Sequence, residues 1–151
     1  MEIHHILSPT DFSEHAQQAV TSAFELAQRF GAKLSLLHVI EVPAYAIEVA
    51  LPLEELERDA RRELARLLPE AEAAHVDVTR LVELGVPSQR ILETATAEQV
   101  DLIVMATHGR TGLGHLVMGS VAERVVRLAP CPVLTIRPPG ARAVDLRATL
   151  I

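Results

Sequence analysis

A glycine-rich loop ahead of a predicted helix is the part of the sequence best suited to bind an anion. Gly109, Gly112 and Gly114 let backbone N–H groups approach a ligand closely, because glycine has no side chain and adopts positive φ readily. Gly119 and Ser120 follow where the helix should begin. A helix N-terminus presents unpaired N–H groups and the positive end of the helix dipole. The loop therefore favours a phosphate site, with an ordinary turn as the alternative.

Two other phosphate-binding patterns do not fit the same loop. A P-loop requires Gly, four residues and then Gly-Lys-Ser/Thr, and no lysine directly follows a glycine in this chain. The dinucleotide fingerprint follows the first strand of its sheet, whereas this loop lies in the last third of the chain and has reversed spacing. Ser120 and Glu123 have the Ser-x-x-Glu spacing of a capping box, which predicts Ser120 as the N-cap of the helix.

Short apolar runs alternate with longer helical patterns, and this alternation predicts how the loop is held. Ser13 is the expected N-cap of the first helix and Gly31 its C-terminal glycine. Pro69 should kink or break the second helix. The expected strands cover 3–8, 33–40, 76–84, 101–107 and 132–137, and the expected helices cover 12–30, 54–74, a segment that begins at Pro87, and 120–128.

This order of elements predicts a single α/β domain over residues 1–137, followed by a C-terminal tail, residues 138–151, without a clear pattern. Strands that alternate with helices form a parallel sheet with helices on both faces. We expect a three-layer, doubly wound fold with a five-stranded parallel sheet of order 3-2-1-4-5. Ligands bind such sheets beyond the carboxyl ends of the strands, where the strand order reverses. The residues after the first, second and fourth strands are therefore the candidates for a site.

The stretch MATHGRTGLGHLVMGSVAERVVRLAPCPVLTIRP resembles the C-terminal half of a universal stress protein. The ATP-binding motif of that family is Gly, two residues, Gly, nine residues and Gly-Ser/Thr. Gly109, the nine residues 110–118, Gly119 and Ser120 match its second and third parts, while Ala106 replaces the first glycine. The segments ILSPTDFSEHA and LSLLHVI resemble the ends of the first two strands in the same family, so the resemblance covers about 137 residues.

The resemblance implies a role for each residue on the nucleoside side of the site. Asp11 should hydrogen-bond the ribose hydroxyls, Pro9 and Thr10 should line the adenine side, and Val39 should offer backbone hydrogen bonds to adenine. A turn or cap ahead of the first helix is the alternative role for Asp11. The residues that should pack under the nucleoside are Met105 and Ala106.

The resemblance also implies the phosphate contacts. Gly109, Gly119, Ser120 and Val121 should hold the phosphates, largely through backbone N–H groups, with one further bond from the Ser120 hydroxyl. Arg110 could reach a β- or γ-phosphate as a charged donor, or be a solvated loop residue.

The last strand is an outer strand in this topology, and it is apolar. Val133, Leu134, Thr135 and Ile136 carry no charge, and an apolar edge without charges invites pairing with another chain. The family resemblance implies a homodimer with antiparallel pairing of this strand across a two-fold axis. Coverage of the edge by the tail, residues 138–151, is the alternative.

Charge, cysteine content and the N-terminus exclude several classes of protein. The net charge of −6 disfavours a nucleic-acid partner. The single cysteine, Cys131, cannot form an intrachain disulfide and is interpreted as a small buried hydrophobe, which favours a reducing compartment. The chain shows no signal-peptide pattern and no apolar run of about 20 residues, so we expect a cytoplasmic protein without a membrane partner. The seven histidines form no metal motif, and any Mg²⁺ is expected to arrive with nucleotide phosphates.

These observations together predict a regulatory, dimeric stress-response module that binds ATP, ADP or AMP. Two alternatives stay open. A slow ATPase would have to rely on Arg110 and the nearby histidines His108 and His115 for its chemistry. The other alternative is a family member that binds no nucleotide and acts only through protein contacts, because Ala106 replaces the motif glycine.

Overall fold

Strands and helices alternate along the chain as the sequence predicts. The computed structural model describes residues 2–42, 52–72, 74–109 and 118–137. Arg110, His115 and the tail, residues 138–151, lie outside these residues. The elements are β1 (His5–Pro9), α1 (Glu14–Phe30), β2 (Lys33–Glu41), α2 (Leu53–Arg66), β3 (Val78–Gly85), α3 (Pro87–Ala97), β4 (Leu102–Ala106), α4 (Ser120–Leu128) and β5 (Val133–Ile136).

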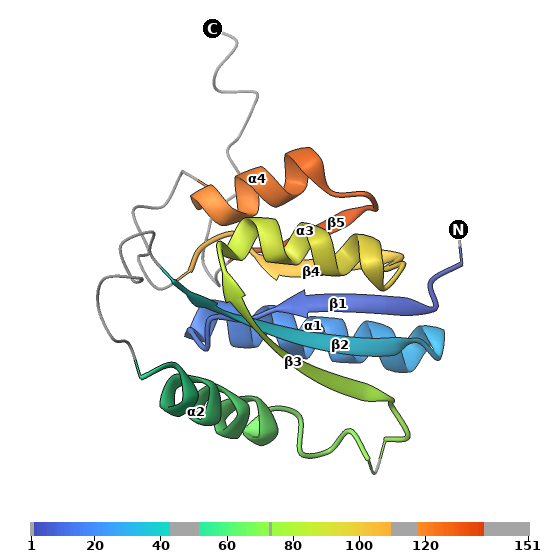
Figure 1. Cartoon of the computed structure of the whole chain (residues 1–151). Helices are drawn as coiled ribbons and strands as arrows, with labels where there is room; N and C mark the ends of the chain where they lie inside the picture. The colour runs from blue at the N-terminus through green and yellow to red at the C-terminus, as the bar shows by residue number, and fades with distance from the viewer. Residues whose placement is uncertain (1, 43–51, 73, 110–117, 138–151) are drawn as a thin grey trace, which may run out of the picture.

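All four strand pairings are parallel, and the strand order is β3-β2-β1-β4-β5, which confirms the predicted topology. Among the described elements β3 and β5 are the outer strands. Figure 1 shows α1 and α2 on one face of the sheet and α3 and α4 on the other. The order reverses between β1 and β4, so their carboxyl ends diverge there and leave room for a ligand.

The two faces of the sheet bury separate hydrophobic clusters. Val20 and Phe24 of α1 and Leu64 of α2 pack on one face. Ile91 of α3 and Val125 of α4 pack on the other. All five residues of β4 are buried, as expected for a strand that is covered on both sides. Each fully buried aliphatic side chain stabilises the fold by about 1.5–3 kcal/mol, so the clusters hold the strand ends in place.

Both predicted cap residues of α1 are confirmed. The Ser13 side chain accepts a hydrogen bond from the Ala16 N–H at 3.2 Å, and Gly31 adopts a left-handed conformation with φ 63°. The helix starts at Glu14 rather than at Phe12, because Phe12 has a positive φ of 64° and cannot continue a right-handed helix. The four residues between strand and helix, 10–13, therefore form a tight turn.

The predicted end of the second helix is wrong. The second helix ends at Arg66 rather than at residue 74, and Pro69 follows in a turn. The Arg80 guanidinium binds the carbonyl oxygens of Leu64 at 2.9 Å and Leu67 at 2.7 Å, which satisfies the backbone groups at that end.

Ser120 is not the N-cap of α4. Gly119 takes that position, and no side chain caps the helix. The Gly119 N–H donates to the Thr107 carbonyl oxygen at 2.8 Å, so a backbone bond to the end of β4 replaces the expected capping box.

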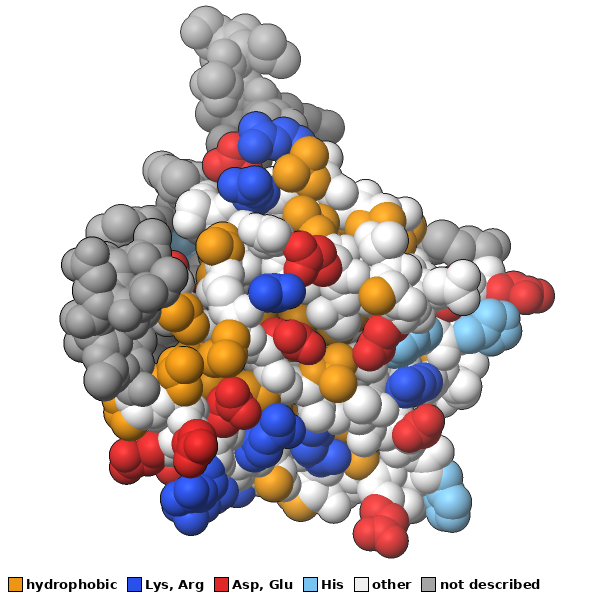
Figure 2. Space-filling model, in the orientation of Figure 1, with side chains coloured by type: hydrophobic (Ala, Val, Ile, Leu, Met, Phe, Trp, Pro, Cys, Tyr) orange, Lys and Arg blue, Asp and Glu red, His pale blue; other side chains and the backbone are white. Residues whose placement is uncertain are grey.

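The surface carries charges of both signs close together. On α2, the guanidinium groups of the arginines lie 2.9–3.9 Å from neighbouring carboxylates in three pairs, Arg61–Glu57, Arg62–Asp59 and Arg66–Glu63. Figure 2 shows such red and blue side chains interspersed over the visible face. None of the helices in the described part of the chain is both long enough and apolar enough to cross a membrane.

Cys131 is half-buried against the cluster under α3 and α4. Burial raises the pKa of its thiol above the ordinary value. A thiol that resists ionisation is a poor nucleophile, in agreement with the expectation of a small core side chain.

Candidate functional site

A pocket of about 940 Å³ lies at the carboxyl edge of the sheet, where the topology predicts a ligand site. Its floor comes from the ends of β1, β2 and β4, and its walls from the starts of α3 and α4 and from α2. Sites for small molecules enclose about 300–1,000 Å³, so a mononucleotide would fit.

The pocket brings together every predicted nucleotide-binding residue that the structure describes. The residues that share this lining are Pro9, Thr10, Asp11, Val39, Met105, Ala106, Gly109, Gly119, Ser120 and Val121. Arg110 lies outside the described residues.

Sequence reasoning missed a further group of lining residues. They come from β2, from the turn before α1 and from the start of α3, and include Phe12, His38, Glu41, Pro87, Ser88 and Ile91. No motif marks these residues. The position of β2 next to β1 is the signal that could have indicated His38 and Glu41.

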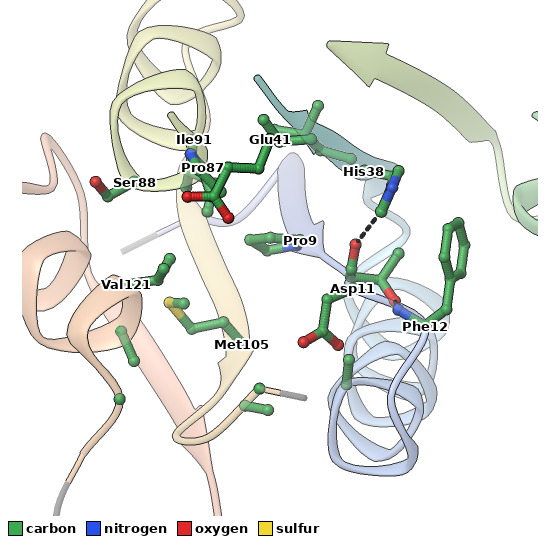
Figure 3. Close-up of a pocket in the computed structure, with 18 of the residues that line it drawn as sticks. Pro9, Asp11, Phe12, His38, Glu41, Pro87, Ser88, Ile91, Met105 and Val121 are labelled. Carbon is green, nitrogen blue, oxygen red and sulfur yellow. Dashed lines mark hydrogen bonds between the residues drawn. The ribbon is translucent and has the colours of Figure 1, made fainter. Parts of the chain in front are cut away.

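One part of the pocket is an apolar slot. Pro9, Met105 and Val121 surround the same space from three different elements, with Ile91 behind them (Figure 3). Met105 and Ile91 are also part of the buried cluster under α3 and α4, and Val121 packs against it. A flat, largely apolar ring would be desolvated there, because each wall presents carbon or sulfur atoms.

The backbone N–H and C=O of Val39 border this slot, and β1 ends too early to pair with them. In a parallel sheet the N–H and C=O of one residue point to the same neighbouring strand, and alternate residues point to opposite neighbours. The Leu37 carbonyl oxygen faces the β1 side, where it accepts from the Thr10 N–H at 2.8 Å. Val39, two residues on, faces the same side, and β1 already ends at Pro9, opposite Leu37. Its N–H and C=O therefore stand beside the pocket as an adjacent donor and acceptor.

The Asp11 carboxylate lies between the turn ahead of α1 and Gly109. One oxygen, Oδ1, accepts the Ser13 N–H at 3.0 Å, a bond typical of a turn ahead of a helix. A Cβ on Gly109 would lie 2.7 Å from the other, Oδ2, so any larger residue there would displace the Asp11 carboxylate. The turn role of Asp11 and its place in the pocket are thus compatible.

The first turn of α4 supplies backbone N–H groups to the opposite end of the pocket. Gly119 is fixed to Thr107, and a Cβ there would lie 3.2 Å from the Thr107 carbonyl oxygen. The Glu123 N–H closes the first helical turn on the Gly119 carbonyl oxygen at 2.9 Å. The N–H groups of Ser120 and Val121 come before that bond and have no partner inside the helix. They are suited to an anion.

Among the described residues, a cation and a histidine lie near this end. Arg124 lines the pocket, and His108 bonds through Nδ1 to the Thr107 hydroxyl at 2.9 Å. Within the described residues, no three His, Cys, Asp or Glu side chains are grouped so that they could hold a metal ion.

The fold and the pocket define a doubly wound α/β protein with a pocket at the carboxyl edge of the sheet. The family model described as the universal stress protein family matches residues 2–137. A universal stress protein of Thermus aquaticus is 40% identical over 136 residues, which cover 87% of this chain and 97% of that relative. The chain belongs to the universal stress protein family, as its motifs predict.

Solved structures agree with this assignment. The structure of MJ0577, a protein of Methanocaldococcus jannaschii, has a TM-score of 0.80 and 29% identity, with 91% of this chain and 98% of that chain covered. A universal stress protein from Archaeoglobus fulgidus in complex with dAMP shares the fold, with a TM-score of 0.67, 19% identity, and 90% and 99% of the two chains covered.

Proposed function

We propose that this protein binds an adenine mononucleotide, ATP, ADP or AMP, in the pocket and acts as a regulatory module rather than as an enzyme. One observation carries the proposal. A single pocket joins an apolar slot, an adjacent backbone donor and acceptor at Val39, and the N–H groups at the start of α4 that have no partner within the helix. These three features match the base, its polar edge and the phosphates of a nucleotide. The Archaeoglobus fulgidus relative that was solved with dAMP supports adenine as the base.

The polar edge of adenine complements the Val39 backbone. Adenine presents a ring nitrogen that accepts a hydrogen bond next to an exocyclic amine that donates one. The Val39 N–H would serve the first and its C=O the second, while Pro9 and Met105 pack on the two faces of the ring. Such a pair of backbone bonds requires no particular side chain, so base recognition does not depend on a charged residue.

The sugar and phosphates would follow the line from Asp11 to α4. The Asp11 carboxylate accepts hydrogen bonds only, and ribose hydroxyls are donors that fit it. The N–H groups of Ser120 and Val121 would receive the first phosphate, since the Gly119 N–H is already bonded to Thr107. Ala106 ends β4 with 8% of its surface exposed, so the methyl group that replaces the motif glycine is largely packed away.

The test is thermal unfolding of nucleotide-stripped protein with and without ATP, ADP or AMP. A ligand at 100 times its Kd stabilises the folded state by about 2.7 kcal/mol. That gain raises the Tm by roughly 5–10 °C, at about 2–4 °C per kcal/mol. Asp11→Ala should remove most of this shift, while Asp77→Ala, a matched change at an exposed position far from the pocket, should keep it. The proposal fails if none of the three nucleotides shifts the Tm of the unchanged protein.

We further propose that two copies pair through β5. Val133, Leu134, Thr135 and Ile136 form an outer strand, and Leu134 is 41% exposed. Val126 and Leu128 on the adjacent helix α4 are 45% and 52% exposed, which extends the apolar surface. Light scattering on Leu134→Arg should then give a monomer, whereas Phe30→Arg, at an exposed residue of α1, should stay dimeric. A monomeric unchanged protein at micromolar concentration would contradict the dimer.

A further inference from the structure

The turn between β1 and α1 holds a bulky side chain in a backbone conformation that bulky residues avoid. Phe12 has φ 64°, in the left-handed region that favours glycine and asparagine. It directly follows Asp11, the residue to which we assign the ribose. Unfavourable backbone conformations persist only where surrounding contacts hold them, and they cluster at ligand sites. The contacts that hold Phe12 therefore bear on how Asp11 is placed.

Two hydrogen bonds within the turn contribute to this conformation. The Phe12 N–H donates to the Thr10 hydroxyl at 3.1 Å, and the Ser13 N–H donates to Asp11 at 3.0 Å. Both bonds are local, and both use side chains that any similar turn could supply. They do not explain why an aromatic residue occupies the left-handed position.

His38 of β2 contacts the turn from outside, and Phe12 also packs against the hydrophobic cluster under α1 and α2. Its Nδ1 lies 2.8 Å from the Thr10 carbonyl oxygen, and a carbonyl only accepts, so Nδ1 carries the proton and donates. Its ring also stacks on the ring of Phe12, with centroids 4.3 Å apart and planes at 30°. Figure 3 shows Phe12 and His38 beside Asp11, with the bond from His38 drawn. His38 thus fixes the residue before Asp11 and the residue after it.

We propose that His38 and Phe12 are positioning residues for Asp11, and that together they aim its carboxylate at the ribose hydroxyls. This inference rests on the proposed nucleotide site. Without the stack, Phe12 keeps the hydrogen bonds of the turn and its packing against the hydrophobic cluster but loses the aromatic contact that supports positive φ. A return to the common negative region would rotate the peptide that follows Asp11. The carboxylate would then leave its position beside Gly109, where Oδ2 lies close to the glycine.

The measurement compares two ligands that differ only in the groups Asp11 would bind. AMP carries both ribose hydroxyls and 2′,3′-dideoxy-AMP carries neither, so the ratio of their Kd values reports the Asp11 contact alone. Hydrogen bonds to a charged group are worth about tenfold or more in affinity, so the unchanged protein should prefer AMP by about that factor. Asp11→Ala should bring the ratio close to one.

Phe12→Ala and His38→Ala should also bring the ratio close to one, while the Kd for dideoxy-AMP stays within about twofold. Phe30→Ala is the matched control, because Phe30 is a half-exposed phenylalanine at the far end of α1 and its loss should leave the ratio unchanged. Two further variants separate the contacts of His38. His38→Asn keeps an N–H for the Thr10 carbonyl without the aromatic ring, and His38→Phe keeps the ring without the N–H.

A loss of affinity that is equal for AMP and dideoxy-AMP would overturn the inference, because a merely structural role weakens both ligands alike. Unchanged ratios in the His38 and Phe12 variants would overturn it as well. If Phe12→Ala does not fold, His38→Asn and His38→Phe decide the question. If the unchanged protein binds neither ligand, the proposed nucleotide site is refuted instead. Measuring the unchanged protein first distinguishes this outcome from a failure of the positioning role.

Discussion

The two edges of the sheet differ in whether their polar groups find hydrogen-bond partners within the chain. At the amino edge, the chain satisfies its own hydrogen-bonding groups. At the carboxyl edge, a pocket of about 940 Å³ borders the Val39 backbone and the first N–H groups of α4. Both edges are built from the ends of the same strands, so strand chemistry alone does not explain the contrast.

The amino edge is closed by a network of side chains. The Asp101 carboxylate accepts the N–H groups of His4 at 2.8 Å and His5 at 2.9 Å. The Ser35 hydroxyl, which is fully buried, bonds Nε2 of His5 at 2.8 Å and donates to Glu98 at 3.0 Å. This network connects β1, β2 and the turn before β4.

This difference between the two edges indicates which edge of the sheet carries the function. Most buried polar groups in proteins have a partner, so groups left without one indicate a ligand. The amino edge is occupied by its own side chains and should govern stability. At the carboxyl edge, backbone N–H groups of Val39 and of the first turn of α4 border the pocket, so this edge should govern binding. If this division is correct, substitutions at the two edges have separable effects.

The largest difference between the two edges is expected for two glycine substitutions, one that affects binding and one that affects stability. Gly119→Val places a branched side chain at the N-terminus of α4. The Cβ of the new side chain would lie 3.2 Å from the Thr107 carbonyl oxygen. This substitution should remove the nucleotide-dependent rise in Tm, roughly 5–10 °C at saturating ligand. Gly31→Ala at the other edge meets no atom within 4 Å, but its φ of 63° disfavours alanine. It should cost about 1–2 kcal/mol of stability and keep the full nucleotide shift.

Thermal unfolding of both glycine variants, with and without AMP, checks this pair. A nucleotide shift that survives in Gly119→Val would place the phosphates away from α4. A shift that disappears in Gly31→Ala would show that stability and binding are not divided between the edges.

The next effect concerns the buried network at the amino edge. Ser35→Ala leaves Nε2 of His5 with only the Glu98 carboxylate at 3.4 Å and removes the donor to that carboxylate. An unsatisfied buried group costs about 1–3 kcal/mol, so urea unfolding should show a loss in this range. Thr21→Ala, which removes an exposed hydroxyl on α1, is the matched control and should cost much less. The Kd for AMP should be the same in both variants, and a weakened Kd in Ser35→Ala would contradict the division.

The sequence predicts the fold well because its signals are local and repeated. The apolar run of β4, the serine before α1 and Gly31 after it each indicate one structure on their own. With nine such elements in alternating order, few sheet topologies fit, and the observed strand order is the predicted one. The family motif placed the described site residues at the same edge.

The rest depends on contacts between segments far apart in the chain. The strand order could indicate that His38 lines the site, but no local pattern predicts its bond to Thr10, which joins residues 28 positions apart. Ser120 was expected as a cap, yet a backbone bond from Gly119 to Thr107 replaces the side-chain cap. The length of α2 was overestimated, since its helical composition continues beyond the point where Pro69 and Arg80 end it. The first two failures come from tertiary contacts that no local pattern shows, and the third combines such a contact, from Arg80, with the local effect of Pro69.

The smallest predicted effect depends on pH and again belongs to the amino edge. Backbone hydrogen bonds from His4 and then His5 hold the pKa of the Asp101 carboxyl below its ordinary value. A carboxyl with a lowered folded-state pKa stabilises the fold above its unfolded pKa of about 3.9, and this contribution is lost as the pH falls through the folded pKa. Because solvent reaches this carboxylate, Asp101→Asn should cost no more than about 1 kcal/mol at pH 7.

Urea unfolding at a series of pH values should then show the two proteins converge. The difference in unfolding free energy between the unchanged protein and Asp101→Asn should be constant above about pH 5 and shrink below about pH 4. Asp77→Asn, at an exposed position of the same edge, should show no such convergence. A difference that stays constant down to about pH 2 would mean that the carboxylate charge contributes nothing. The two N–H bonds would then act through geometry alone, and the amino edge would be held by its neutral contacts.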